Sequence, residues 1–179
     1  MLETTLSAAA AGSTTAWDAL VERYSGLVWS VARAHRLSHA DAADVVQTTW
    51  LRLVENLDRI RDPDKVGAWL ATTARRECLR AIRLKARQEL TGDIDLFEEP
   101  VADPIDEPIL IEERDGLLWR AFRTLGDRCQ ELLRLLAAPT EPSYEEISAA
   151  LDMPIGAIGP TRGRCLEQLR VRLAGMGAV

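Results

Sequence analysis

Apolar residues recur three and four positions apart along most of this chain, and no other feature restricts its fold as strongly. The pattern occupies residues 16–35, 38–57, 63–85, 109–125, 127–136 and 143–172. Spacing of this kind gathers the apolar side chains on one face of an α-helix. No segment shows the sustained two-residue alternation of a half-buried strand. The sequence therefore predicts an all-α protein.

Residues 142–172 have the pattern of a helix-turn-helix motif. Ser143 and Glu146 form a capping box, in which each side chain accepts a hydrogen bond from a backbone N–H at the start of a helix. Pro154 ends that helix and suits the opening of the next. The second helix carries the bases Arg162, Arg164, Arg170 and Arg172 against the single acid Glu167. A cationic second helix suits the major groove of DNA, and a helical hairpin with a solvated basic face is the alternative.

The net charge of −6 conceals two basic regions separated by an acidic one. Residues 88–115 contain eleven acids and one base, a local charge of −10 that leaves +4 for the rest of the chain. Within that rest, residues 69–87 hold six bases and one acid. This distribution indicates a nucleic-acid partner, although the average charge alone argues against one.

The same features predict two small helical domains joined by an acidic linker. Between 91 and 108, three prolines, a glycine and the acidic run interrupt the helical period, which is typical of a linker. We expect three helices in the core of the first domain and four in the second. The predicted division is a flexible tail at 1–13, the first domain at 14–87, the linker at 88–108, the second domain at 109–174 and a tail at 175–179.

Composition excludes several other classes of protein. With 47% hydrophobic and 28% charged residues the chain resembles a soluble globular protein, and no apolar run is long enough to cross a bilayer. Its first residues lack the positive charge of a secretory signal. Cys78, Cys129 and Cys165 include no C-x-x-C pair, so we expect neither a disulfide framework nor a zinc site. The expected protein is reduced and cytoplasmic, without a membrane partner.

No arrangement of residues indicates catalysis. His35 and His39 are four apart, but Ser38 is expected to begin a new helix between them, so they need not share a face that binds metal. We expect both at the surface or at a helix boundary. No nucleophile with a base, glycine-rich phosphate loop or carboxylate pair stands out. We therefore expect no catalytic residue, no metal and no cofactor.

Four stretches of the chain carry a family likeness. They are AWDALVERYSGLVWSVA at 16–32, DAADVVQTTWLRL at 41–53, AWLATTARRECLRAIR at 68–83 and SYEEISAALDMPIGAIGPTRGRCLEQLR at 143–170. In order and spacing they resemble the extracytoplasmic-function (ECF) sigma factors of bacterial RNA polymerase, which keep only the second and fourth regions of larger sigma factors. The resemblance implies promoter-specific transcription initiation. The first domain would then bind core polymerase and the −10 promoter element, and the second domain the −35 element.

The resemblance also implies roles for individual residues. The clamp helices of the polymerase's largest subunit would bind Asp41, Asp44, Gln47, Thr48, Arg52 and Asn56. The −10 element would contact Arg59, Arg61, Lys65, Arg75, Arg76, Arg80 and Arg83, and the −35 element Thr161, Arg162 and Arg164. Arginines can neutralise phosphates, which gives an affinity that falls with salt. Trp69 lies on the apolar stripe, so we expect it to pack in the core rather than stack on a base.

Gly159 and Pro160 depart from the family pattern in the second helix of the motif. Both residues destabilise a helix interior, the proline by about 3 kcal/mol. We therefore expect this helix to begin later than in the family, or to kink near Pro160.

Expected partners follow from the same resemblance. They are core polymerase, promoter DNA and an anti-sigma protein, since such factors are commonly held by one. The acidic linker would thread toward the polymerase active centre, whereas a solubilising spacer is the alternative. A stand-alone helix-turn-helix transcriptional regulator is the alternative function. It would bind a palindromic site as a dimer and would leave the basic residues at 69–87 without a role.

Overall fold

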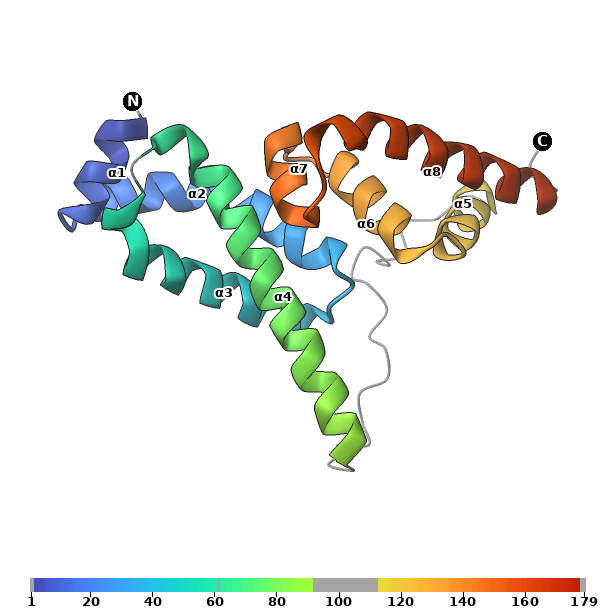
Figure 1. The fold of residues 1–179 in the computed structure, drawn as a ribbon, viewed down its shortest axis with the longest axis horizontal. Helices are drawn as coiled ribbons and strands as arrows, with labels where there is room; N and C mark the ends of the chain where they lie inside the picture. The colour runs from blue at the N-terminus through green and yellow to red at the C-terminus, as the bar shows by residue number, and fades with distance from the viewer. Residues whose placement is uncertain (1, 61, 92–112, 178–179) are drawn as a thin grey trace.

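The computed structural model describes residues 2–60, 62–91 and 113–177, and these ranges contain eight α-helices, two short 3₁₀ helices and no strand (Figure 1). The α-helices are α1 Leu2–Ala10, α2 Thr14–Ala34, α3 His39–Asn56, α4 Val66–Thr91, α5 Glu113–Arg123, α6 Asp127–Leu136, α7 Tyr144–Leu151 and α8 Ile155–Gly175. The 3₁₀ helices η1 Leu57–Arg59 and η2 Pro63–Lys65 connect α3 to α4. The all-α prediction is confirmed, while most of the predicted linker lies outside the described residues.

Helix α1 occupies a segment that was expected to be a flexible tail. Its side chains Leu6 and Ala9 are buried, and α1 contacts α2 and η2. After α1, Gly12 has a φ of +89°, a left-handed conformation that glycine adopts without steric cost. Ser13 Oγ then accepts a hydrogen bond from the backbone N–H of Ala16 at 3.3 Å and caps α2. The tail prediction is wrong because alanine favours helix intrinsically and two apolar side chains suffice to dock the segment.

Both predicted serine caps are confirmed. Ser38 Oγ accepts a hydrogen bond from the backbone N–H of Asp41 at 3.1 Å, at the start of α3. At α7 both bonds of the capping box are present. Ser143 Oγ accepts from the N–H of Glu146 at 3.2 Å, and the Glu146 carboxylate accepts from the N–H of Ser143 at 2.8 Å. Local side-chain chemistry therefore sets where these two helices begin.

Helix α8 begins earlier than predicted. It starts at Ile155, directly after Pro154, and its assignment continues through Gly159 and Pro160 to Gly175. Pro160 lies in the second turn of α8, where its missing N–H removes one intrahelical hydrogen bond. Ile158 is fully buried and holds this part of the helix on the core. The expectation of a late start is wrong because tertiary packing overrides the low helix propensity of these residues.

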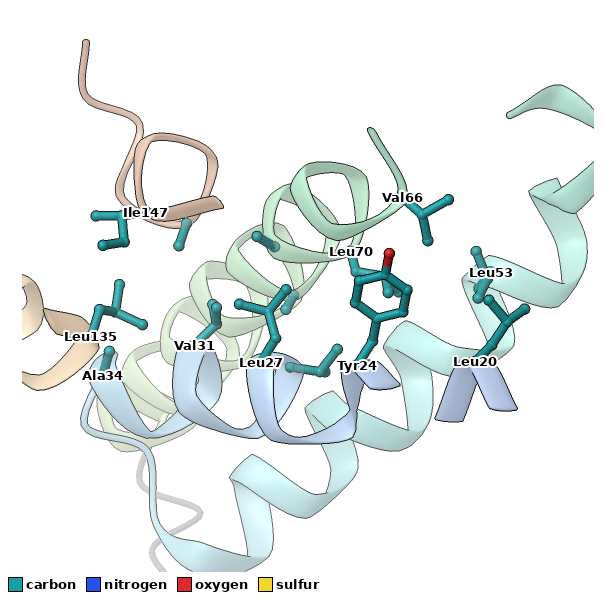
Figure 2. Close-up of a cluster of buried hydrophobic side chains, with 14 of the residues drawn as sticks. Leu20, Tyr24, Leu27, Val31, Ala34, Leu53, Val66, Leu70, Leu135 and Ile147 are labelled. Carbon is teal, nitrogen blue, oxygen red and sulfur yellow. The ribbon is translucent and has the colours of Figure 1, made fainter. Parts of the chain in front are cut away.

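The helices of both predicted domains share one hydrophobic core. Figure 2 shows Leu135 of α6 beside Ala34 of α2, and Ile147 of α7 near α4 in the same cluster. Helix α7 packs on α4, and α6 packs on α2 (Figure 1). The two halves therefore form one packed unit, a feature that the sequence pattern did not predict.

Two glycines allow the halves to approach closely. A Cβ at Gly26 of α2 would lie 2.3 Å from Cγ2 of Thr140, and one at Gly67 of α4 would lie 2.1 Å from Oε1 of Glu146. Both distances are far shorter than a van der Waals contact, so a side chain at either position would require the Thr140 methyl group or the Glu146 carboxylate to move. Across the same junction Arg75 pairs with Asp152 at 3.0 Å and Arg36 pairs with Asp127, while His35 Nδ1 lies 3.7 Å from a carboxylate oxygen of Glu131.

A disulfide joins Cys129 of α6 to Cys165 of α8, with the Cα atoms 5.4 Å apart. The expectation of no disulfide is wrong because the two cysteines are 36 positions apart and meet only through the packing of α6 on α8. Cys78 of α4 is a buried free thiol.

Candidate functional site

Three of the residues predicted to bind polymerase line a groove between α3 and α4. Asp41, Asp44 and Thr48 form one wall, and Arg80 and Lys85 of α4 belong to the other. The groove has a volume of about 510 Å³, and Lys85 Nζ lies 4.0 Å from Asp41 Oδ2 across it. The α4 wall also contains Glu77, so the groove presents both signs of charge and suits a partner surface that carries both.

The other three predicted residues of α3 do not line this groove. Arg52 donates a hydrogen bond to Glu55 at 2.9 Å, and this bond raises the pKa of the guanidinium above its usual value. The Asn56 amide donates to the backbone carbonyl of Arg52 at 2.9 Å. Gln47 is exposed. Arg52 and Asn56 thus stabilise the end of α3 locally, whereas Gln47 is accessible to a partner.

Two exposed apolar residues on α3 were not predicted from the sequence. Leu51 is 57% exposed and Val54 is 58% exposed. With Gln47 they are spaced by four and three residues, so the three side chains lie on one side of the helix. The available signal was that Leu51 and Val54 fall outside the stripe that contains Val45 and Leu53. Exposed apolar side chains beside polar ones are typical of a protein interface.

Three predicted DNA-binding arginines form one exposed face of α4. Arg76, Arg80 and Arg83 are spaced by four and three residues, and the C-terminal end of α4 extends beyond the other helices (Figure 1). Arg80 lies 3.9 Å from Glu77, and the Arg83 Nε donates to the backbone carbonyl of Leu79 at 3.0 Å. Exposed interactions of this kind are weak, so these guanidinium groups can exchange them for phosphates.

Arg75 is not presented together with those three arginines. It precedes Arg76 by one position and therefore points about 100° away around the helix. Its Nη2 pairs with Oδ2 of Asp152 at 3.0 Å, in the turn between α7 and α8. In this arrangement Arg75 links the two halves of the molecule.

The remaining residues predicted to contact the −10 element precede α4. Arg59 at the end of η1 and Lys65 at the end of η2 are exposed. Arg61 lies outside the described residues. Trp69 is half-buried and packs against the core cluster, which agrees with the expectation of core packing while leaving part of the ring accessible.

The residues predicted to contact the −35 element lie in the first half of α8. Arg162 and Arg164 are exposed, and Arg164 Nη2 donates a hydrogen bond to Thr161 Oγ1 at 3.1 Å. The buried residues of α8 are Ile158 and Cys165. These two side chains fix which side of α8 faces the core, so the arginines are held in solvent.

The turn before α8 is held by neighbouring side chains. Asp152 has a φ of 51°, a left-handed conformation that aspartate tolerates better than most residues. The guanidinium of Arg128 from α6 donates to the backbone carbonyls of Leu151 and Asp152. Ser148 Oγ donates to the carbonyl of Met153 at 2.6 Å. These bonds restrict the angle between α7 and α8.

The described residues contain no group of three or more histidine, cysteine or acidic side chains arranged to hold a metal ion. His35 is buried at the C-terminal end of α2, while His39 is exposed and its ring lies 5.1 Å from that of Trp29. Among the helices of the described ranges, none is long and apolar enough to cross a membrane.

A helix-turn-helix and a second exposed basic helix on one all-α chain are features of DNA-binding proteins. A protein-family model described as sigma-70 region 2 matches residues 20–88, which include α3 and most of α4. The ECF RNA polymerase sigma-E factor of Escherichia coli strain K12 is 25% identical over 157 residues, or 82% of this chain and 81% of that protein. The ECF RNA polymerase sigma factor SigE of Mycolicibacterium smegmatis is 28% identical over 162 residues, or 88% of this chain and 62% of that protein.

Two solved structures have a similar fold. CnrH, solved in complex with the cytosolic domain of CnrY, matches with a TM-score of 0.62 and 24% identity, over 96% of each chain. RpoE from Bartonella quintana, solved with the anti-sigma factor NepR, matches with a TM-score of 0.59 and 23% identity. That match covers 82% of this chain and 89% of RpoE.

The chain is therefore similar over most of its length to ECF sigma factors of RNA polymerase, and its residues 20–88 match sigma-70 region 2.

Proposed function

We propose that this protein is a sigma factor that acts in the cytoplasm as a dissociable subunit of RNA polymerase, with a separate contact surface for each partner. The outer side of α3 binds the clamp helices of the largest polymerase subunit. Helix α4, with η1 and η2, binds the −10 promoter element, and α8 binds the −35 element.

The observation that carries the polymerase contact is the mixed outer surface of α3. Leu51 and Val54 are more than half exposed on the same helix as Gln47, and α3 also supplies Asp41 and Asp44 to the groove. Protein interfaces combine an apolar centre with a polar rim in this way. The charged walls of the groove supply orientation, while the apolar pair supplies area that a partner can remove from water.

The promoter contacts are supported by two sets of exposed arginines. Arg76, Arg80 and Arg83 form one face of α4, which suits neutralisation of successive phosphates. Arg162 and Arg164 project from the first half of α8, the part that enters a major groove in helix-turn-helix proteins. Arginine serves both phosphate and base contacts, so these residues position the helix and can also contribute to base recognition.

Arg75 contacts the −10 element only after its ion pair with Asp152 has opened. Asp152 is an exposed turn residue, and ion pairs with exposed partners contribute little free energy. Promoter binding by Arg75 therefore requires that the turn between α7 and α8 moves away from α4.

An anti-sigma protein is the third partner that we propose. CnrH was solved with CnrY, and the Bartonella RpoE with the anti-sigma factor NepR. A similar protein that covers α3 would compete with core polymerase.

Paired variants separate the polymerase contact from the promoter contact. Leu51→Asp together with Val54→Asp should abolish binding to purified core polymerase, whereas Val171→Asp on α8, at 59% exposure, should not.

Arg162→Ala should weaken run-off transcription from promoters that depend on a −35 element, and should leave core binding unchanged. Arg170→Ala is its control, because Arg170 is engaged with Glu167 at 2.9 Å nearer the end of α8. Normal core binding by the α3 double variant would overturn the proposed polymerase surface.

A further inference from the structure

The disulfide between Cys129 and Cys165 lies directly behind the DNA-contacting part of α8. Cys165 follows Arg164 in sequence and is 1% exposed, while Arg162 and Arg164 are exposed on α8. The bond ties this point of α8 to the first turn of α6. It therefore fixes both the rotation of α8 and its position along its own axis.

Helix α8 depends on such an anchor more than most helices do. Its first half contains Gly156, Gly159 and Gly163, and none of the three has a neighbouring atom within 4 Å that would exclude a side chain. Glycine and proline are the two least favourable residues in a helix interior, and Pro160 lies among these glycines. The only buried side chains of α8 are Ile158 and Cys165. Without the disulfide, only the noncovalent packing of Ile158 and the partly buried Ala157 on the core would hold the weak first half of the helix in its register.

A disulfide in a protein that acts among cytoplasmic thiols is typically transient or regulatory rather than structural. Cys129 is only partly buried, so a small thiol reagent reaches it more easily than it reaches Cys165. The third cysteine provides a contrast. Cys78 is fully buried, and burial raises the pKa of its thiol to about 12, which keeps it unreactive.

We propose that Cys129 and Cys165 form a reversible redox modification site that controls promoter recognition by α8, an inference that rests on the proposed −35 contact. The oxidised form holds α8 in the orientation that binds DNA. In the reduced form α8 loses its covalent anchor and binds the −35 element more weakly. Binding of core polymerase through α3 is the same in both forms, since α3 lies on the other half of the molecule.

The reaction partner is a small-molecule disulfide such as oxidised glutathione. The Cys129 thiolate attacks one sulfur of that disulfide, so that a mixed disulfide forms and one thiolate leaves. The Cys165 thiolate then attacks the Cys129 sulfur and releases the second thiolate. Two protein thiols and one small disulfide thus become one protein disulfide and two small thiols. The reverse exchange with reduced glutathione opens the bond.

The test uses the protein of residues 1–179 with core polymerase and a promoter fragment identified by run-off transcription. The protein is equilibrated in buffers of reduced and oxidised glutathione, the thiols are trapped, and the fraction of disulfide is measured by mass spectrometry. We expect the Cys129–Cys165 bond to open and close across this range. Full reduction should weaken promoter binding about tenfold. Without the disulfide α8 is less restrained, so binding to DNA must order the helix at a cost in conformational entropy. The affinity for core polymerase should not change.

Two variants and one further measurement complete the design. Cys129→Ser with Cys165→Ser should bind the promoter like the reduced protein in every buffer, and Cys78→Ala should respond like the wild type. Hydrogen exchange on the wild-type protein, which requires no substitution, should show faster exchange of α8 amides after reduction.

Equal promoter affinity in the two redox forms would overturn the inference, as would a bond that never forms or never opens in these buffers. After any of these three results, the proposed function would still stand if the factor supported transcription. Absence of promoter binding in both forms, with no transcription, would overturn the proposed function and this inference together.

Discussion

Gly26 offers a sharp test of the packing between the two halves of the protein. It lies in the interior of α2, where the connection between α6 and α7 approaches so closely that a Cβ would be 2.3 Å from Cγ2 of Thr140. If the halves were apart in solution, an alanine at this position would meet no obstacle. The consequence of Gly26→Ala therefore depends directly on whether the packed arrangement forms.

The substitution changes two free energies of opposite sign. Alanine in place of glycine in a helix interior stabilises the fold by about 1 kcal/mol. The clash of the added methyl group with Thr140 costs about 1–3 kcal/mol, the usual range for overpacking. We therefore expect Gly26→Ala to lower the free energy of unfolding by about 0–2 kcal/mol.

Thr140→Ala removes the clashing Cγ2 and provides the matching background. The nearest remaining atom, the Cβ of residue 140, lies 3.7 Å from the new methyl group, which is an ordinary contact. In this background Gly26→Ala should raise the free energy of unfolding by about 1 kcal/mol, so the coupling energy of the double-mutant cycle should be about 1–3 kcal/mol.

Urea unfolding followed by circular dichroism measures all four proteins of the cycle. Gly116→Ala in α5 is the control, because its Cβ would meet nothing within 4 Å and its effect should not depend on residue 140. Equal stabilisation by Gly26→Ala in both backgrounds would refute the packing of the C-terminal half on α2.

Three further predictions concern promoter binding and the helix-turn-helix. Replacing Arg76 and Arg80 with alanine should lower the slope of log affinity against log salt by about 1.4–1.8, because two phosphate contacts are lost. Fluorescence anisotropy of promoter binding by the holoenzyme measures this slope, and an unchanged slope would exclude phosphate contacts at these two residues. Ser143→Ala should lower the free energy of unfolding by about 1 kcal/mol in urea, because one bond of the capping box is lost, and a neutral effect would contradict the cap. Ile158→Ala should cost about 2–5 kcal/mol and increase hydrogen exchange in α8, whereas a cost below 1 kcal/mol would show that this side chain is not buried.

Much of the fold could be predicted because its signals are local. Helical periodicity located α2, α3 and the helices of the motif, and the caps at Ser38 and Ser143 depend on residues only three positions away. The exposed arginines at 76, 80 and 83 also follow from spacing along a single helix.

Features that depend on tertiary contacts could not be predicted in this way. The early start of α8 depends on burial of Ile158, and the orientation of Arg75 depends on the position of Asp152. Pairing of Cys129 with Cys165 requires α6 and α8 to be neighbours. Nothing within a window of a few residues encodes these contacts, because each joins elements that are distant in sequence.

The central claim is that this chain directs promoter-specific initiation by core RNA polymerase, and run-off transcription from a library of genomic fragments tests it most directly. We expect transcripts that require both purified core polymerase and this protein. Their start points should lie at a constant distance downstream of a shared pair of −35 and −10 sequences. Absence of transcripts from every fragment, together with no complex between the protein and core polymerase, would contradict the claim.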